Sequence, residues 1–340
     1  MAPMTRSRAQ DGLPTQIMAE YYRQRAGAGL IITEGTAPSP NGQGYARIPG
    51  IYNDEQAKGW KKVTEAVHAQ GSKIAVQLMH SGRISHPLNL PQGAEVVAPS
   101  AIAAGGTIWT DQEGAVPHPT PREMSIDDIT ETVAEFVNAS QKAVAAGFDA
   151  VELHAANGYL LEQFLNPISN KRTDSYGGSI ENRSRIILEI AGAVSDAIGK
   201  DKVGIRLSPY GVNGDLRAYD ELEETYHYLA EQLNHLGILY LHIVDHSAMG
   251  APEVPSSLKE DLKQRFSNLY ILSGGFDKSG AETALQAGKG DLIAFGRPFI
   301  SNPDLVARME TGAELNEPDF DTFYMGGEKG YIDYPVLAEV

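Results

Sequence analysis

The stretch VELHAANGYLLEQFL, Val151 to Leu165, begins with a short apolar run and then places His154, Asn157 and Tyr159 within six residues. This run is one of seven that are rich in Val, Ile and Leu, and longer segments of helical period lie between such runs. The alternation is the pattern expected of βα units around a parallel sheet. We therefore interpret the opening stretch as a buried strand with polar residues at its carboxyl end.

The sequence predicts seven strands, several helices and a possible eighth strand. The strands are LIITE from Leu30, KIAVQLMH from Lys73, AVELH from Ala150, VGIRLS from Val203, LYLHIV from Leu239, LYILSGG from Leu269 and DLIAFGR from Asp291. The helices include residues 14–25, 54–70, 125–146, 180–198 and 220–236, several of which begin with an Asp or Ser suited to an N-cap. The opening residues 1–4 supply the eighth strand if the chain begins at the end of a strand whose earlier residues are absent.

Eight βα units close into a barrel, so the predicted fold is α/β, a (β/α)8 TIM barrel with a truncated first strand. We expect residues 1–340 to form a single domain. Segment 85–122 is rich in Gly, Pro and Thr and is expected to be a loop excursion with a small hairpin, of the kind that shapes a pocket. A doubly wound fold is not favoured, because the nearest nucleotide-binding turn, AGAGL from Ala26, precedes a strand and lacks the third glycine.

Composition excludes several classes of function. Acidic residues outnumber basic ones by 44 to 28, and the net charge of −16 disfavours nucleic acid and anionic membranes as partners, so a small-molecule ligand is expected. The absence of cysteine excludes disulfides, iron–sulfur clusters and a catalytic thiol, and it fits a reducing compartment. The sequence has no apolar run of the length of a membrane span and no pattern of a secretory signal, so we expect a cytoplasmic protein.

Active-site groups of a (β/α)8 barrel project from the carboxyl ends of its strands, and the last two ends carry a recognisable unit. They contain the SGG turn of Ser273, Gly274 and Gly275 and the FGR turn that ends with Gly296 and Arg297. Glycine amides and a guanidinium commonly bind phosphate at this place, which favours a phosphorylated ligand. The alternative is two glycine turns and a surface arginine.

Arg206 and Gln77 are polar residues on strands that should be buried. A buried guanidinium needs an anionic partner, which is either a ligand or one of two carboxylates, Glu152 and Asp245. Gln77 offers donors and an acceptor together, as an imide-like heterocycle requires, although it could equally satisfy neighbouring backbone groups.

The three polar residues of the opening stretch also have two interpretations. If the chain turns helically after the strand, His154 and Asn157 face the same ligand atom and offer it two neutral donors. Tyr159 follows closely, and a phenol in an enclosed site can act as a general acid toward a developing carbanion. A core histidine, an asparagine cap and a packing tyrosine are equally plausible. No metal site is expected, since the histidines form no compact motif such as HExxH.

Taken together, these residues lie in motifs that resemble the old yellow enzyme family, the FMN-dependent ene-reductases. The resemblance covers essentially the whole chain. It rests on MAPMTRSR from Met1, AEYYRQRAGAGLIITEGT from Ala19, VQLMHSGRISH from Val76, VELHAANGYLLEQFLNP from Val151, NKRTDSYGGSIENRSR from Asn170, GIRLSP from Gly204, FGRPFISNPDL from Phe295 and FYMGGEKGYIDYP from Phe323.

The resemblance implies a role for each candidate residue. The flavin ring would be contacted by Pro3, Met4, Thr5, Gly35, Gln77, Arg206 and Phe323, with the positive charge of Arg206 stabilising the anionic reduced flavin. The 5′-phosphate would be held by Ser273, Gly274, Gly275, Gly296 and Arg297. The substrate would be bordered by Tyr45, Met79 and Tyr324.

The resemblance also implies a ping-pong reaction in which NADPH or NADH and an electron-poor alkene bind in turn in the same space. His154 and Asn157 would hydrogen-bond the carbonyl or nitro oxygen of the alkene while hydride reaches its β-carbon, and Tyr159 would protonate the α-carbon.

Departures from the family pattern leave alternatives open. Relatives usually have further residues before MAPMT, which supply a bottom-capping hairpin and most of the first strand. One alternative is therefore a flavin-binding protein with impaired turnover, and another is a non-flavin phosphosugar barrel lyase or isomerase. Asn157 stands where some relatives have histidine, and Met79 where some have tryptophan, so the pocket shape does not transfer directly.

Overall fold

Seven parallel strands form one curled sheet in the computed structural model, which describes residues 1–337. In spatial order they are β1 (Leu30–Thr36), β2 (Lys73–Leu78), β7 (Ala150–Ala155), β8 (Val203–Leu207), β9 (Tyr240–Val244), β10 (Leu269–Ser273) and β11 (Leu292–Ala294). Each neighbouring pair is parallel. The seven predicted strands are thus confirmed, although the last residues of several predicted runs lie in the loops that follow.

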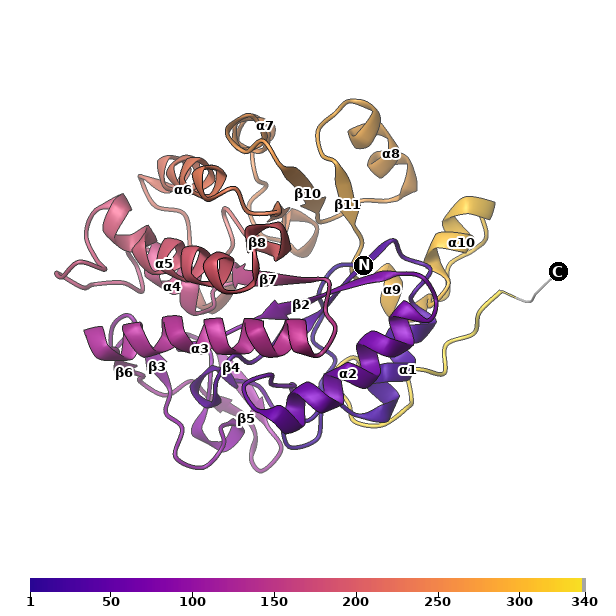
Figure 1. The fold of residues 1–340 in the computed structure, drawn as a ribbon, viewed down its shortest axis with the longest axis horizontal. Coiled ribbons are helices and arrows are strands. Elements are labelled where there is room, and N and C mark those ends of the chain that lie inside the picture. Colours follow the sequence, from indigo (N-terminus) through magenta and orange to yellow (C-terminus); the bar gives the residue numbers. More distant parts are fainter. Residues whose placement is uncertain (338–340) are drawn as a thin grey trace.

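The opening residues of the chain join the two edges of this sheet. The Met1 nitrogen donates to the Leu30 carbonyl at 2.7 Å, and the Ile32 N–H donates to the Met1 carbonyl at 3.1 Å. On the other side, the Ala2 N–H donates to the carbonyl of Phe295, directly after β11, at 2.8 Å. Figure 1 accordingly shows the N-terminus beside β11. These residues occupy the place of the eighth strand, although they form no regular strand.

Helices cover the outside of the sheet (Figure 1). They are α1 (Gln16–Gln24), α2 (Asp54–His68), α3 (Ile126–Ala145), α4 (Leu160–Leu165), α5 (Ile180–Ile198), α6 (Leu222–Leu236), α7 (Ser256–Arg265), α8 (Lys278–Gln286), α9 (Pro298–Ser301) and α10 (Leu305–Thr311). Short 3₁₀ turns lie at η1 (Pro40–Gly42), η2 (Pro87–Asn89), η3 (Lys200–Lys202), η4 (Asn213–Asp215), η5 (Ser247–Met249) and η6 (Phe320–Thr322).

Local sequence explains why the predicted helices start where they do. Asn53, Ser125 and Ser179 precede α2, α3 and α5, and each side chain accepts a hydrogen bond from the backbone N–H three residues further on. These bonds satisfy donors that a helix leaves free at its first turn. Among the described residues, no helix has both the length and the apolar character needed to cross a membrane.

The barrel interior combines buried aliphatic residues with a few polar ones. Every residue of β7, β8 and β9 is buried, which fits their nearly continuous apolar sequence. The strand register places Arg206 between His154 on one neighbouring strand and His242 on the other. In the same way it places Gln77 beside Glu152. Polar side chains from separate runs of sequence therefore meet near the carboxyl ends of the strands.

Segment 85–122 lies between β2 and α3 and contains three short strands and the first residue of a fourth. β4 (Thr107–Thr110) and β5 (Gly114–Pro117) form an antiparallel hairpin, and β3 (Val97–Ala98) pairs with β6 (Arg122–Glu123). Residues 107–109 of the hairpin line a cavity at the carboxyl end of the barrel.

Candidate active site

Two cavities adjoin at the carboxyl ends of the strands, with volumes of about 680 and 570 Å³. We call the first the hairpin cavity, because the β4–β5 hairpin borders it, and the second the turn cavity, because the SGG and FGR turns border it. Thr5, Asn157 and Arg206 line both cavities. The two cavities therefore form one elongated cleft of the size that binds small molecules.

Every residue predicted to contact a ligand lines this cleft. The hairpin cavity is lined by Gly35, Tyr45, Gln77, Met79, His154 and Tyr159. The turn cavity is lined by Ser273, Gly274, Gly275, Gly296, Arg297 and Phe323. Both cavities are lined by Pro3, Met4, Thr5, Asn157, Arg206 and Tyr324. The structure brings these residues together, while their roles remain predictions.

Arg206 lies where the two cavities meet and forms no ion pair with residues 1–337. Its Nε atom is buried without a hydrogen-bond partner in that range. The two carboxylates considered from the sequence bond elsewhere: Glu152 pairs with His242 at 2.8 Å, and Asp245 pairs with Lys259 at 2.6 Å. Arg206 therefore forms no close ion pair with Glu152 or Asp245, although the charge of Glu152 acts on it. Burial lowers the pKa of Arg206 and the negative charge of Glu152 opposes this shift, so the guanidinium remains charged at neutral pH and the cleft wall carries a positive charge.

A hydrogen-bonded chain inside the barrel engages two of the predicted ligand-binding residues. Gln77 Nε2 donates to Glu152 at 2.8 Å, the same carboxylate bonds to His242 Nδ1 at 2.8 Å, and His242 Nε2 lies 2.9 Å from Ser273 Oγ. The Ser273 hydroxyl itself donates to the Ile243 carbonyl at 3.3 Å. The Ser273 side chain is thus satisfied within the barrel.

The SGG turn requires glycine for two separate reasons. Gly274 has a φ of +111°, which side-chain-bearing residues rarely adopt, and a Cβ there would lie 1.9 Å from the Asp245 carbonyl oxygen. Gly275 follows with a φ of +69°. Successive glycines of this kind allow the backbone to approach an anion closely.

We expect Gly274→Ala to destabilise the protein by about 2–5 kcal/mol, because the new methyl group combines a strained φ with a steric clash. We also expect FMN binding to be lost. Gly288→Ala is the matched control, since Gly288 has a φ of +66° but nothing within 4 Å of an added Cβ. Urea unfolding and an FMN titration would measure both effects. If Gly274→Ala and Gly288→Ala had the same free energy of unfolding and the same FMN affinity, this account of the turn would be contradicted.

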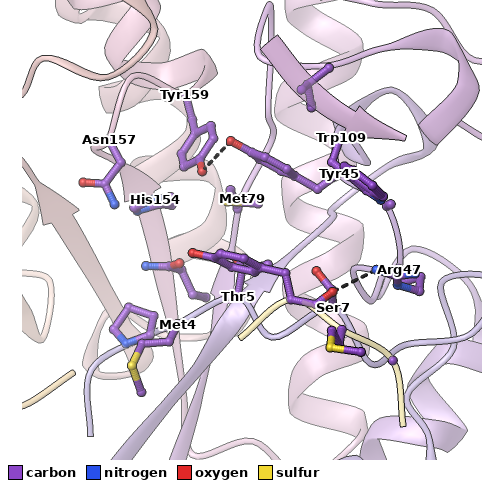
Figure 2. Close-up of a pocket in the computed structure, with 18 of the residues that line it drawn as sticks. Met4, Thr5, Ser7, Tyr45, Arg47, Met79, Trp109, His154, Asn157 and Tyr159 are labelled. Carbon is purple, nitrogen blue, oxygen red and sulfur yellow. Dashed lines mark hydrogen bonds between the residues drawn. The ribbon is translucent and has the colours of Figure 1, made fainter. Parts of the chain in front are cut away.

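His154, Asn157 and Tyr159 present three buried or partly buried polar groups to the hairpin cavity (Figure 2). Burial and the charge of Arg206 lower the pKa of His154 well below its usual value, so its imidazole is neutral, and its Nδ1 has no partner among residues 1–337. Tyr159 Oη lies 3.1 Å from Tyr45 Oη. Burial, followed by the effect of Tyr45, raises the pKa of Tyr159 well above its usual value, so the phenol keeps its proton.

A buried carboxylate that the sequence interpretation missed holds the loop of this trio in place. Glu162 accepts hydrogen bonds from the Gly158 N–H at 2.6 Å, from the Ser208 hydroxyl at 3.0 Å and from the Tyr226 hydroxyl at 3.0 Å. Ser208 Oγ in turn accepts from the Asn157 N–H at 2.7 Å. The signal in the sequence that could have identified Glu162 is its position as an acidic residue within the apolar segment that follows His154, Asn157 and Tyr159.

Glu162 is expected to make stability depend on pH. Burial raises its pKa from 4.5 to about 7 in the folded protein. Between these values the folded state binds more protons than the unfolded state, so the free energy of unfolding falls as pH rises, by about 3 kcal/mol from this group. Glu162→Gln should remove that part of the decline. Urea unfolding of the wild type and of Glu162→Gln at pH 5 and pH 8 measures the difference. An identical fall in the free energy of unfolding for the two proteins would contradict the prediction.

The mouth of the cleft is braced by residues that the sequence interpretation also missed. Arg47 pairs with Asp111 of the hairpin at 2.8 Å and donates to the Tyr324 carbonyl at 2.8 Å. Trp109 Nε1 donates to the same Asp111 carboxylate at 3.2 Å. Figure 2 shows Arg47 and Trp109 near Tyr45, so the hairpin and the C-terminal segment are tied together at the cleft entrance.

The cleft fits flavin mononucleotide, which combines a phosphate with a planar ring that gains negative charge on reduction. For the phosphate, the turn cavity provides glycine backbone and Arg297. For the ring, the junction provides the unpaired guanidinium of Arg206, and the hairpin cavity provides Gln77. The fold and the cleft are thus those of a barrel enzyme with a site for a phosphorylated ligand that carries a planar ring.

Comparison with known proteins gives the family. The model of the NADH:flavin oxidoreductase / NADH oxidase family matches residues 1–316. A probable flavin mononucleotide-dependent alkene reductase of Leishmania infantum is 40% identical over 346 residues, which cover 99% of this chain and 93% of the relative. The solved structure of morphinone reductase has a TM-score of 0.95 and 47% identity over 99% of this chain and 91% of its own, and the same enzyme has been solved with tetrahydroNAD. An old yellow enzyme homologue from Zymomonas mobilis has a TM-score of 0.93 and 38% identity over 99% of this chain and 95% of its own.

The chain belongs to the NADH:flavin oxidoreductase / NADH oxidase family, which is the old yellow enzyme family that its motifs resemble. It is an FMN-dependent oxidoreductase with the TIM-barrel architecture of these relatives. The predicted family, fold class and enzyme class are therefore confirmed, and the flavoenzyme is favoured over a phosphosugar lyase or isomerase.

Proposed function

We propose that the protein is an NAD(P)H-dependent ene-reductase that acts on electron-poor alkenes such as enones, enals, maleimides and nitroalkenes. The observation that carries this proposal is that unpaired Arg206 and the neutral donors His154, Asn157 and Tyr159 border one cavity. When bound, FMN would supply the hydride-transfer chemistry that links the nicotinamide to the β-carbon of the alkene. The residues of the chain hold the cofactor, polarise the alkene and deliver a proton.

Residues at the floor and at the turns of the cleft hold the cofactor in this proposal. The ring would be contacted by Pro3, Met4, Thr5, Gly35, Gln77 and Phe323, and the phosphate by Ser273, Gly274, Gly275, Gly296 and Arg297. Arg206 favours negative charge on the ring, because a cation in a site shielded from water stabilises an anion strongly. It would thereby raise the reduction potential of bound flavin.

His154 and Asn157 would bind the oxygen of the electron-withdrawing group. The imidazole of His154 is neutral, so it donates a hydrogen bond without adding a second cation beside Arg206. Charge on the bound oxygen grows as hydride arrives at the β-carbon. Donors fixed before the reaction therefore stabilise the transition state more than the bound substrate.

Tyr159 would give its proton to the α-carbon of the alkene. The raised pKa of its phenol means that the proton is present at neutral pH, as a general acid requires. The hydrogen bond with Tyr45 fixes the position of the hydroxyl group. Tyr45, Met79 and Tyr324 would border the remainder of the alkene.

Both NADPH and NADH are candidates for the reductant, and the morphinone reductase complex with tetrahydroNAD supports a nicotinamide in this cleft. The absence of cysteine further supports a reducing compartment such as the cytoplasm. The acidic net charge of −16 supports small molecules, rather than nucleic acid or membranes, as partners.

An anaerobic steady-state assay tests the proposal. NADPH and NADH oxidation should be stimulated by 2-cyclohexenone, with one cyclohexanone formed for each dinucleotide consumed, and initial rates should follow ping-pong kinetics. A protein that stays colourless after incubation with FMN would contradict the proposal. A yellow protein that oxidises neither dinucleotide would select the alternative of impaired turnover.

A further inference from the structure

We propose that His246 is a positioning residue that sets the orientation of the Asn157 carboxamide, so that its NH₂ group faces the ligand. The inference rests on the proposed role of Asn157 in binding the substrate oxygen. His246 Nε2 lies 2.6 Å from Asn157 Oδ1, although the two residues are 89 positions apart in the chain. Both residues line the turn cavity.

Hydrogen bonds already fix the backbone of Asn157. The Asn157 N–H donates to Ser208 Oγ at 2.7 Å, the Asn157 carbonyl accepts from Asn213 Nδ2 at 2.7 Å, and the φ of Asn157 is +59°. The orientation of its side-chain carboxamide, which can turn by about 180° and exchange its oxygen and nitrogen, is not fixed by them. The two ends of a carboxamide have nearly the same shape but opposite hydrogen-bonding character. Without an anchor, Asn157 could present its oxygen to the cleft and repel an oxygen-bearing ligand.

His246 removes this ambiguity by occupying the amide oxygen. When Nε2–H donates to Oδ1, the Nδ2 group keeps both hydrogens, and residues 1–337 offer it no acceptor. Burial and the charge of Arg206 lower the pKa of His246 to about 4, so the imidazole is neutral at the working pH and donates through a single N–H. The free donors of Asn157 then match a carbonyl, nitro or phenolate oxygen.

The loop that carries His246 is rigid enough for this task. His246 follows β9, and its carbonyl accepts a hydrogen bond from the Met249 N–H at 2.8 Å. The preceding Asp245 bonds to Lys259 Nζ at 2.6 Å and to the Ser247 N–H at 2.8 Å. A side chain held by a braced loop can position its neighbour with little loss of conformational entropy on binding.

Phenol titration of the holoenzyme tests the inference, because phenol offers an oxygen to the same donors and perturbs the flavin absorption without turnover. His246→Phe keeps a ring but removes the donor, and we expect phenol affinity to fall about three- to tenfold. kcat/KM for 2-cyclohexenone should fall by at least the same factor, with kcat lowered as well as KM raised, because the Asn157 donor stabilises the transition state more than the bound substrate. His246→Gln retains a donor and should recover most of the loss. His235→Gln, at an exposed position on α6, is the control and should leave both values unchanged.

A double-mutant cycle separates positioning of Asn157 from any other role of His246. In an Asn157→Ala background, His246→Phe should cause no further loss of phenol affinity, because the group that it positions is absent. An equal loss in both backgrounds, or unchanged affinity in the single variant, would overturn the inference. His246→Leu gives the same comparison if the phenylalanine variant does not retain FMN. A separate outcome distinguishes this inference from the proposed function. If His246→Phe weakens phenol binding but the wild-type protein reduces no enone, the proposed function is contradicted and this inference stands.

Discussion

Tyr159→Phe is expected to slow the oxidation of reduced flavin by 2-cyclohexenone by at least about 100-fold, the usual contribution of a general acid. The hydroxyl of Tyr159 lies in the cleft wall, and its raised pKa keeps the proton in place at neutral pH. Reduction of the flavin by NADPH requires no proton from this group, so that step should change by less than about threefold. Anaerobic stopped-flow measurement of each half-reaction checks both values.

Tyr45→Phe is the matched comparison for this prediction. It removes the hydroxyl group bonded to Tyr159 but leaves the Tyr159 proton available. We therefore expect a smaller slowing of the alkene step than in Tyr159→Phe. Equal slowing of both half-reactions in Tyr159→Phe, or no slowing of either, would remove the proposed role of Tyr159.

Arg206→Met is expected to affect the apoprotein and the holoenzyme in opposite directions. In the holoenzyme the guanidinium would meet the flavin, so we expect FMN affinity to fall by about 10- to 100-fold. In the apoprotein the same guanidinium is buried without an ion-pair partner among residues 1–337, which is costly. The apoprotein variant should therefore unfold at the same temperature as wild type or at a higher one. An FMN titration and thermal unfolding with and without FMN measure both effects.

Arg217→Met is the control for this pair of effects, because Arg217 is exposed, and it should change neither FMN affinity nor apoprotein stability. An Arg206→Met apoprotein that is destabilised but binds FMN with wild-type affinity would show that Arg206 has a structural role. That result would restore the ion-pair interpretation that the geometry of Glu152 and Asp245 argues against.

The sequence predicts the sheet well because each strand is a compact apolar run flanked by loops. It predicts the helices α2, α3 and α5 well because Asn53, Ser125 and Ser179 provide local caps. Closure of the barrel by residues 1–4 is expected only from the count of βα units, and not from a local pattern. Residues 1–2 complete it through backbone hydrogen bonds to Leu30, Ile32 and Phe295, and backbone bonds of this kind leave no pattern in the side chains.

The candidate site is predictable in its members but not in their partners. Polar residues at strand ends identify the cleft, since parallel strands bring their carboxyl ends together. The pairing of Asn157 with His246 is not readable, because it depends on the positive φ of Asn157 and on two loops that are distant in sequence. Gly35 offers a similar lesson: a Cβ there would lie 2.5 Å from Met79 Sδ, so its small size makes room for Met79 as well as for the expected ring.

The central claim is that this cleft passes hydride from a nicotinamide to an alkene through bound FMN, and one anaerobic double-mixing experiment tests it most directly. Wild-type holoenzyme is first mixed with NADPH or NADH and then with 2-cyclohexenone. The account predicts that the flavin absorption is lost in the first step and recovers in the second at a rate that depends on enone concentration, with cyclohexanone as the product. Flavin that stays reduced in the presence of enones and maleimides, and recovers its colour only with oxygen, would contradict it.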